Sequence, residues 1–157
     1  MILIEATDAD FEELICGRAP RDLQLPVGGV ERVEVLTMLR GLAKNIRPAF
    51  TPASWMMVEN REVVGLCSLV KPPSGDGVDF GYGVAVNRRR RGFASAAVGA
   101  LLQWACADHR VQKLRAETSM KNLPSQRVLE RNGFERIGER MDDEDGALIC
   151  WGVATNA

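Results

Sequence analysis

The chain has 157 residues, of which 46% are hydrophobic and 26% are charged. This length and composition predict one globular domain, residues 1–157, that is large enough to bury a real core. Its 20 basic and 21 acidic residues nearly cancel, so no overall field would draw the protein to nucleic acid or to a membrane, and we expect neither as a partner.

The cysteines and the N-terminus indicate the compartment. Four cysteines lie far apart with no Cys-x-x-Cys pair, so we expect reduced thiols rather than disulfides or a metal site. The start, Met1–Glu5, has neither the charged beginning nor the long apolar run of a signal peptide. No apolar segment reaches the ~20 residues of a membrane span. We therefore expect a cytoplasmic protein without a bound metal.

Periodic patterns predict the elements of the first half of the chain. They are a strand at 2–6, a helix capped by residues 7–10 and ending near 15, a loop at 17–29, a helix at about 30–44, and strands at 55–58 and 63–70. A hairpin turn at Asn60 and Arg61 joins the two strands, and residues 72–77 form a further turn. The loop 17–29 holds two prolines and three glycines, and a loop of this length is typical of a functional or mobile segment.

The stretch Gly81–Ala105 begins as a strand and ends as a helix. Apolar residues alternate along a strand at 78–86, and nearly every residue from Phe93 onward is apolar or small, which predicts a buried helix at about 92–108. The joint between them is the basic run Arg88–Arg91 followed by Gly92. Free N–H groups and the helix dipole favour a phosphate there, and a glycine lets the backbone approach it closely.

The remaining elements complete a mixed fold. We expect a strand at 113–118, a helix at about 123–132, and strands at 134–141 and 147–154 that flank an acidic turn. Helices interspersed in a mostly antiparallel sheet define the α+β class. The strand–helix–strand unit 78–118 must make its two strands parallel neighbours.

Two motifs in this region resemble those of one enzyme family. Arg89-x-x-Gly92-x-Ala94 is similar to the pyrophosphate-binding loop of GNAT-type N-acetyltransferases, which use acetyl-CoA. Asn122-x-x-Ser125, followed by Gly133-Phe134, resembles the family's downstream Asn-x-x-Ser/Ala…Gly-Phe segment. The resemblance covers residues 54–154, and the Asn-x-x-Ser pattern is similar to that of the branch acting on ribosomal-protein N-termini.

The resemblance implies a fold and a cofactor site. The fold is a single GNAT-like domain with a sheet of about seven strands, about four helices on both faces, and a V-shaped splay between its two central parallel strands. Pantetheine would lie in this V, and the pyrophosphate would lie on backbone N–H groups at the helix start. The residues implied for acetyl-CoA are Val84, Ala85, Val86, Arg89, Arg90, Arg91, Gly92, Phe93, Ala94, Asn122 and Ser125.

Two carboxylates compete for the role of general base. Glu117 lies five residues before Asn122, where the resembled branch has a catalytic glutamate, but it also forms a charged strand face with Lys113 and Arg115. Asp79, on the predicted strand 78–86, matches a position where the resembled family has a carboxylate that serves as base, directly or through water. Either would act better as a base if burial raised its pKa toward neutrality.

The sequence offers no tyrosine at the position where many relatives have the general acid. Many relatives place a tyrosine at the position of Leu129, as the group that protonates the leaving thiolate. Leucine cannot do this, so the acid is Ser125, a water molecule or no group at all.

These features predict acetyl transfer from acetyl-CoA to a primary amine, by direct attack in a ternary complex. A protein N-terminus, an amino acid and a small amine all remain open as acceptors. The alternative is a non-catalytic module that binds or senses acyl-CoA. Either would be a monomer or a homodimer.

Overall fold

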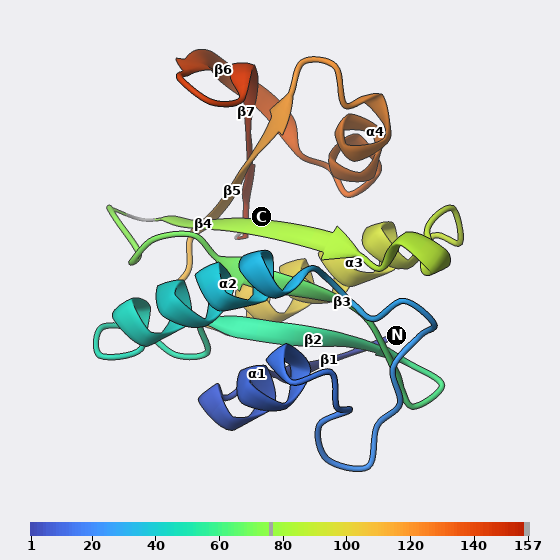
Figure 1. The fold of residues 1–157 in the computed structure, drawn as a ribbon. Helices are drawn as coiled ribbons and strands as arrows, with labels where there is room; N and C mark the ends of the chain where they lie inside the picture. Colours follow the sequence, from blue (N-terminus) through green and yellow to red (C-terminus); the bar gives the residue numbers. More distant parts are fainter. Residues whose placement is uncertain (76, 156–157) are drawn as a thin grey trace.

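The computed structural model of the protein describes residues 1–75 and 77–155. Asp76, in the turn predicted at 72–77, and residues 156–157 lie outside this part. In chain order (Figure 1), the elements are β1 (Ile2–Glu5), α1 (Asp8–Ile15), α2 (Val33–Ile46), β2 (Ser54–Glu59), β3 (Glu62–Leu69), β4 (Gly77–Val84), a 3-10 turn (Val86–Arg88), α3 (Phe93–Ala107), β5 (Lys113–Ser119), α4 (Leu123–Arg131), β6 (Glu135–Asp142) and β7 (Gly146–Ala154).

The strands form one seven-stranded sheet in the order β1-β2-β3-β4-β5-β7-β6. All neighbours are antiparallel except β4 and β5. Helices α1 and α2 cover one face of the N-terminal strands, α3 covers the other, and α4 lies beside the C-terminal strands (Figure 1). The predicted α+β class, strand number and helix number are confirmed.

The two parallel strands separate soon after they meet. β4 pairs with β5 only from Gly77 to Asp79, opposite Lys113 to Arg115. β4 then continues to Val84 while it pairs with β3 alone on its other side. Figure 1 shows β5, β6 and β7 rising away from the rest of the sheet. The predicted V is therefore present, and it leaves one edge of β4 without a strand partner.

The predicted strand 78–86 is two residues too long at its C-terminal end. β4 ends at Val84, and the chain turns because the N–H of Ala85 donates to the Val64 carbonyl (2.8 Å) and that of Arg88 donates to the Ala85 carbonyl (2.8 Å). Val86, placed by alternation on the apolar face, is 71% exposed. Apolar alternation continued past Val84, where β3 bonds to Gln24 of the loop instead of to this segment, with the N–H of Val63 donating to the Gln24 carbonyl (2.9 Å).

The helix predicted from residue 30 begins at Val33 instead. Gly28 and Gly29 have left-handed φ values of +87° and +78°, which place a turn directly before Val30 and delay the helix. Val30 is buried although it lies in the loop, whereas Val33 is half-exposed. The hydrophobic spacing alone could not distinguish these two positions.

The core lies on both sides of the N-terminal strands and continues under α3. Met56 and Met57 are fully buried on opposite faces of β2. Cys67 is buried, Cys150 is half-buried, and Cys16 and Cys106 are exposed; all four are free thiols. Within residues 1–75 and 77–155, no helix is long and apolar enough to cross a membrane.

Candidate active site

A cavity of about 600 Å³ lies in the V, between the C-terminal part of β4, the start of α3 and helix α4. Eight of the eleven residues implied for acetyl-CoA line it: Val84, Arg89, Arg90, Gly92, Phe93, Ala94, Asn122 and Ser125. The other three, Ala85, Val86 and Arg91, are not in its wall. The fold thus brings two motifs about 30 residues apart in the chain to the same hollow.

The start of α3 presents unbonded backbone N–H groups to this cavity. Gly92 is the N-cap residue, with φ +79°, and no side chain caps the helix. The first N–H after the cap that bonds back is that of Ala96, to the Gly92 carbonyl (3.0 Å). The preceding N–H groups, of Phe93 to Ser95, belong to the first helical turn and have no intrahelical acceptor. They give a site suited to a phosphate.

The charges around this cavity are of one sign. Among the residues that the structure describes, no aspartate or glutamate lines it. Five arginines do: Arg88, Arg89, Arg90, Arg127 and Arg131. Such a wall attracts an anion through both charge and donor geometry. Arg127 and Arg131 come from α4 and were not among the residues implied by the sequence, because neither belongs to a motif.

The arginine run 88–91 divides into different roles. The guanidinium of Arg88 is held by the carboxylate of Glu62 on β3, with nitrogen–oxygen distances of 2.6 and 2.9 Å. Arg89 donates from Nε to the Val84 carbonyl (3.2 Å). Arg88 therefore fixes the turn after β4, a role that no sequence pattern could separate from ligand binding.

Helix α4 places Asn122 and Ser125 on the other wall. The side-chain oxygen of Asn122 caps the helix by accepting from the N–H of Ser125 (3.2 Å). The Ser125 hydroxyl also lies 2.6 Å from the hydroxyl of Tyr82, which reaches across the V from β4. Leu129, where many relatives carry a tyrosine, is fully buried. Tyr82 is the one tyrosine in the chain, and the sequence pattern predicts it only as part of the strand 78–86.

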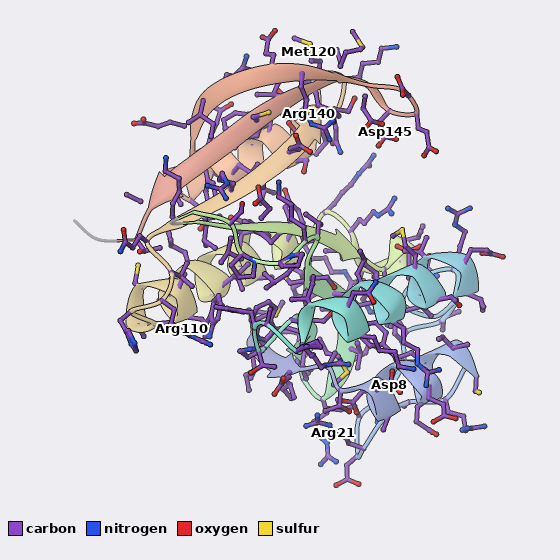
Figure 2. The ribbon with its side chains drawn as sticks, turned by 90° about the vertical axis from the view of Figure 1, so that its left-hand side faces the viewer. Asp8, Arg21, Arg110, Met120, Arg140 and Asp145 are labelled. Atoms are coloured by element: carbon purple, nitrogen blue, oxygen red, sulfur yellow. The ribbon has the colours of Figure 1, made fainter. Side chains whose placement is uncertain are left out.

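A second cavity, of about 780 Å³, lies where β4, β5 and the turn between β6 and β7 meet. Side chains alternate along a strand, so Tyr82 lines the first cavity and Asp79 the second. Both carboxylates proposed as the base, Asp79 and Glu117, line this second cavity together with Arg140, Glu144 and Asp145. Figure 2 shows Arg140 on the C-terminal strands and Asp145 in the turn that joins two of them, both away from the N-terminal helices.

The carboxylate of Glu117 pairs with Arg140, a residue that belongs to no motif in the sequence. Arg140 on β6 forms two hydrogen bonds with the carboxylate, Nη2 donating to Oε1 (2.8 Å) and Nε donating to Oε2. The thiol of Cys150 lies 3.6 Å from Oε2. The bonds from Arg140 lower the pKa of Glu117 even though burial opposes this. Burial therefore does not raise the pKa of this carboxylate toward neutrality.

Asp79 is held in a comparable way. Arg115 on β5 donates to its carboxylate from Nε (3.2 Å) and Nη2 (3.1 Å), and the ammonium of Lys71 lies 3.8 Å away. The pair Asp79–Arg115 sits at the last register pair of β4 and β5. It therefore closes the base of the V as well as facing the second cavity.

Three comparisons with known proteins agree with this geometry. A family model described as an acetyltransferase (GNAT) domain matches residues 1–135. A Bacillus subtilis protein described as an uncharacterized N-acetyltransferase, YjdG, is 32% identical over 84 residues. That match covers 52% of this chain and 50% of the relative, so the chain spans about half the length of this curated protein.

Solved structures share the fold over nearly the whole chain. A putative GNAT-family acetyltransferase from Bordetella pertussis has a TM-score of 0.71 at 21% identity, covering 96% of this chain and 93% of that one. The ribosomal alpha-N-protein acetyltransferase RimL, in complex with coenzyme A, has a TM-score of 0.71 at 14% identity, covering 97% and 92%. At these identities the likeness is one of fold.

Proposed function

The chain belongs to the GNAT acetyltransferase family, and from that premise we propose that it transfers an acetyl group from acetyl-CoA to a primary amine. The observation that carries the proposal is the cavity in the V. It joins a helix N-terminus with bare N–H groups to the unpaired edge of β4, and arginines are its only charged lining among the described residues. A long donor with a phosphate at one end and an extended amide chain at the other fits this arrangement.

In this proposal the pyrophosphate rests on the N–H groups of Phe93 to Ser95, with Arg89 and Arg90 screening its charge. The pantetheine amides bond to the free edge of β4 at Val84. Ala85 contributes less, since its N–H already donates to the Val64 carbonyl. RimL, which shares the fold, was solved with coenzyme A, and this supports the assignment.

The second cavity would hold the acceptor amine. Glu117 is our leading general base, and Asp79 is the alternative. Because Arg140 lowers the pKa of Glu117, this carboxylate is ionised at neutral pH and free to receive a proton from an ammonium. The same low pKa limits its strength as a base, so the acceptor must be positioned well to use it. Ser125 in the first cavity would protonate the leaving sulfur.

The lining of the second cavity favours a cationic acceptor. Glu144 and Asp145 in the turn between β6 and β7 form no ion pair among the described residues. A protein N-terminus, an amino acid and a small polyamine all carry the ammonium group that these carboxylates attract. The Asn-x-x-Ser pattern favours the first of these.

The test is release of free thiol from acetyl-CoA over a panel of peptides, amino acids and polyamines. We expect at least one amine to release thiol faster than background hydrolysis, with acetylation of that amine seen by mass spectrometry. Tight binding of acetyl-CoA with no turnover across all three classes would instead identify an acyl-CoA-binding module.

A further inference from the structure

The hydroxyls of Tyr82 and Ser125 join the two arms of the V. Tyr82 lies on β4 and Ser125 in the first turn of α4, 43 residues later, with their oxygen atoms 2.6 Å apart. The tyrosine hydroxyl also lies 3.3 Å from the backbone carbonyl of Ser125. Both residues line the first cavity, so the pair is part of the wall that faces the donor.

The surroundings of Tyr82 keep its hydroxyl protonated. On β3, the thiol of Cys67 lies directly opposite in the register, and burial raises the pKa of this thiol to about 12. The charged groups that share the cavity from the turn after β4 and from α4 are all arginines, and their positive charge favours the phenolate and not the phenol. Burial raises the pKa of Tyr82, although the bond with Ser125 opposes the shift. The phenol is therefore a proton donor at neutral pH.

We propose that Tyr82 positions the hydroxyl of Ser125 and returns a proton to it, so that the two residues act as a relay to the leaving sulfur. This inference rests on the proposed acetyl transfer. The amine nitrogen bonds to the carbonyl carbon and gives up a proton that passes to solvent, and the carbon–sulfur bond breaks with its electron pair on sulfur. Ser125 gives its proton to that sulfur, Tyr82 gives its own to Ser125, and water reprotonates Tyr82.

The geometry supports a relay over a purely structural bond. A serine hydroxyl rotates freely and can point its proton in several directions, and the contact with Tyr82 fixes its orientation. The chain has a second hydroxyl pair at the same distance, Ser54 and Ser68 (2.6 Å), but both are fully enclosed between β2 and β3 and touch neither cavity. That pair serves as an internal comparison for a hydroxyl bond without access to substrate.

The first experiment observes Tyr82 directly. Since it is the only tyrosine, the ultraviolet absorbance of phenolate reports its titration alone. We expect saturating CoA to move the titration midpoint to higher pH than saturating desulfo-CoA does, because a thiolate beside Ser125 disfavours a second negative charge. Equal midpoints with CoA and desulfo-CoA in the unsubstituted protein would overturn the relay.

The second experiment uses kinetics with an amine acceptor found active. Tyr82→Phe and Ser125→Ala should each lower kcat by about 10-fold or more, and the double variant should lose no more than the worse single one. Affinity for acetyl-CoA should change by less than about 3-fold by calorimetry. Ser68→Ala, which breaks the enclosed pair, should leave kcat unchanged.

The outcomes separate this inference from the function on which it rests. If Tyr82→Phe keeps the turnover and the pH profile of the wild-type protein, the relay is overturned and the proposed acetyl transfer still stands. Binding without turnover in the wild-type protein overturns both.

Discussion

At the scale of single residues, Gly92 in the wall of the first cavity has a backbone conformation that favours glycine. Its φ of +79° lies in the left-handed region, and an added Cβ would meet no atom within 4 Å. Strain, not a clash, therefore opposes a larger residue, and a β-branched one suffers most. Because the backbone must rotate to relieve that strain, the N–H groups after it would turn away from the phosphate.

We expect Gly92→Val to weaken binding of CoA at least about 10-fold, since the first-turn N–H groups supply most of the phosphate contact. Calorimetry with CoA measures this. The matched control is Gly17→Val, since Gly17 has a φ of +76° and equally open surroundings but lies at the end of α1. Both variants should lose similar stability, and only the first should lose affinity. Unchanged affinity in folded Gly92→Val would remove this loop from the donor site.

The second residue-scale prediction ranks the two carboxylates. If Glu117 is the base, Glu117→Gln lowers kcat/KM by about 10²-fold or more at neutral pH, because glutamine cannot take the proton. Affinity for acetyl-CoA should stay nearly unchanged. Activity should recover partly as pH rises, since more of the amine then arrives deprotonated. Steady-state kinetics over a pH series measures both effects.

The control for the lost ion pair is Glu13→Gln, which breaks a carboxylate–arginine pair with Arg18 (2.9 Å) on the far side of the molecule. It should leave kinetics unchanged. Asp79→Asn should cost less activity than Glu117→Gln. If Asp79→Asn instead abolishes turnover while Glu117→Gln behaves as wild type, Asp79 is the base, and Glu117 only pairs with Arg140.

At the scale of elements, the close approach of β3 and β4 sets the wall of the V. A Cβ on Gly65 would collide with the carbonyl oxygen of Gly83 and lie 2.7 Å from Sδ of Met57. The carbonyl belongs to the backbone and cannot swing aside, so β4 would have to move. Gly65 pairs with Val84, which lines the donor cavity.

We therefore expect Gly65→Ala to destabilise the protein by about 1–3 kcal/mol and to weaken binding of CoA as well. Gly41→Ala is the matched control, because Gly41 lies exposed inside α2 and an added Cβ meets nothing within 4 Å. That change should stabilise the helix by about 0.5–1 kcal/mol. Denaturant unfolding of both variants measures the difference. Equal stability in the two would show that the strands do not need this close approach.

At the scale of the whole molecule, carboxylates held by arginines make stability depend on acid pH. Hydrogen bonds from Arg40 lower the pKa of Asp8, and those from Arg88 lower that of Glu62. For Asp10, burial raises the pKa, but bonds from Arg21 and Thr7 outweigh it and the net shift is downward. Figure 2 shows Asp8 and Arg21 together at the α1 end of the molecule.

Each lowered pKa has the same consequence for stability. The stabilisation is complete above the ordinary carboxyl values of 3.8 and 4.5, and it is lost as pH falls through the lower folded values. We expect the melting temperature to fall between about pH 5 and about pH 2. Asp10→Asn should be less stable than wild type at neutral pH and should converge with it in acid. Parallel curves at all pH values would contradict this.

What the sequence determined by itself was local. The alternation along 78–84, the apolar run after Phe93 and the glycine before it specify a strand, a helix and the turn between them, because each depends on neighbours within a few residues. These predicted the α+β class and the parallel pair, and most of the residues that the family resemblance implied for acetyl-CoA line the first cavity. The same local patterns continued to Val86, two residues past the end of β4 at Val84, because β3 bonds there to Gln24 from a loop far away in the chain.

The tertiary structure decided what depends on residues far apart in the chain. Arg140 reaches Glu117 from 23 residues away, and Tyr82 reaches Ser125 from 43. No sequence period relates such pairs. Arg140 and Glu117 lie on β6 and β5, with β7 between them in the sheet, and Tyr82 and Ser125 meet across the V between β4 and α4. Their contacts set the protonation of the carboxylate and the direction of the hydroxyl, since charge and hydrogen bonding act over a few ångströms of space and not along the chain.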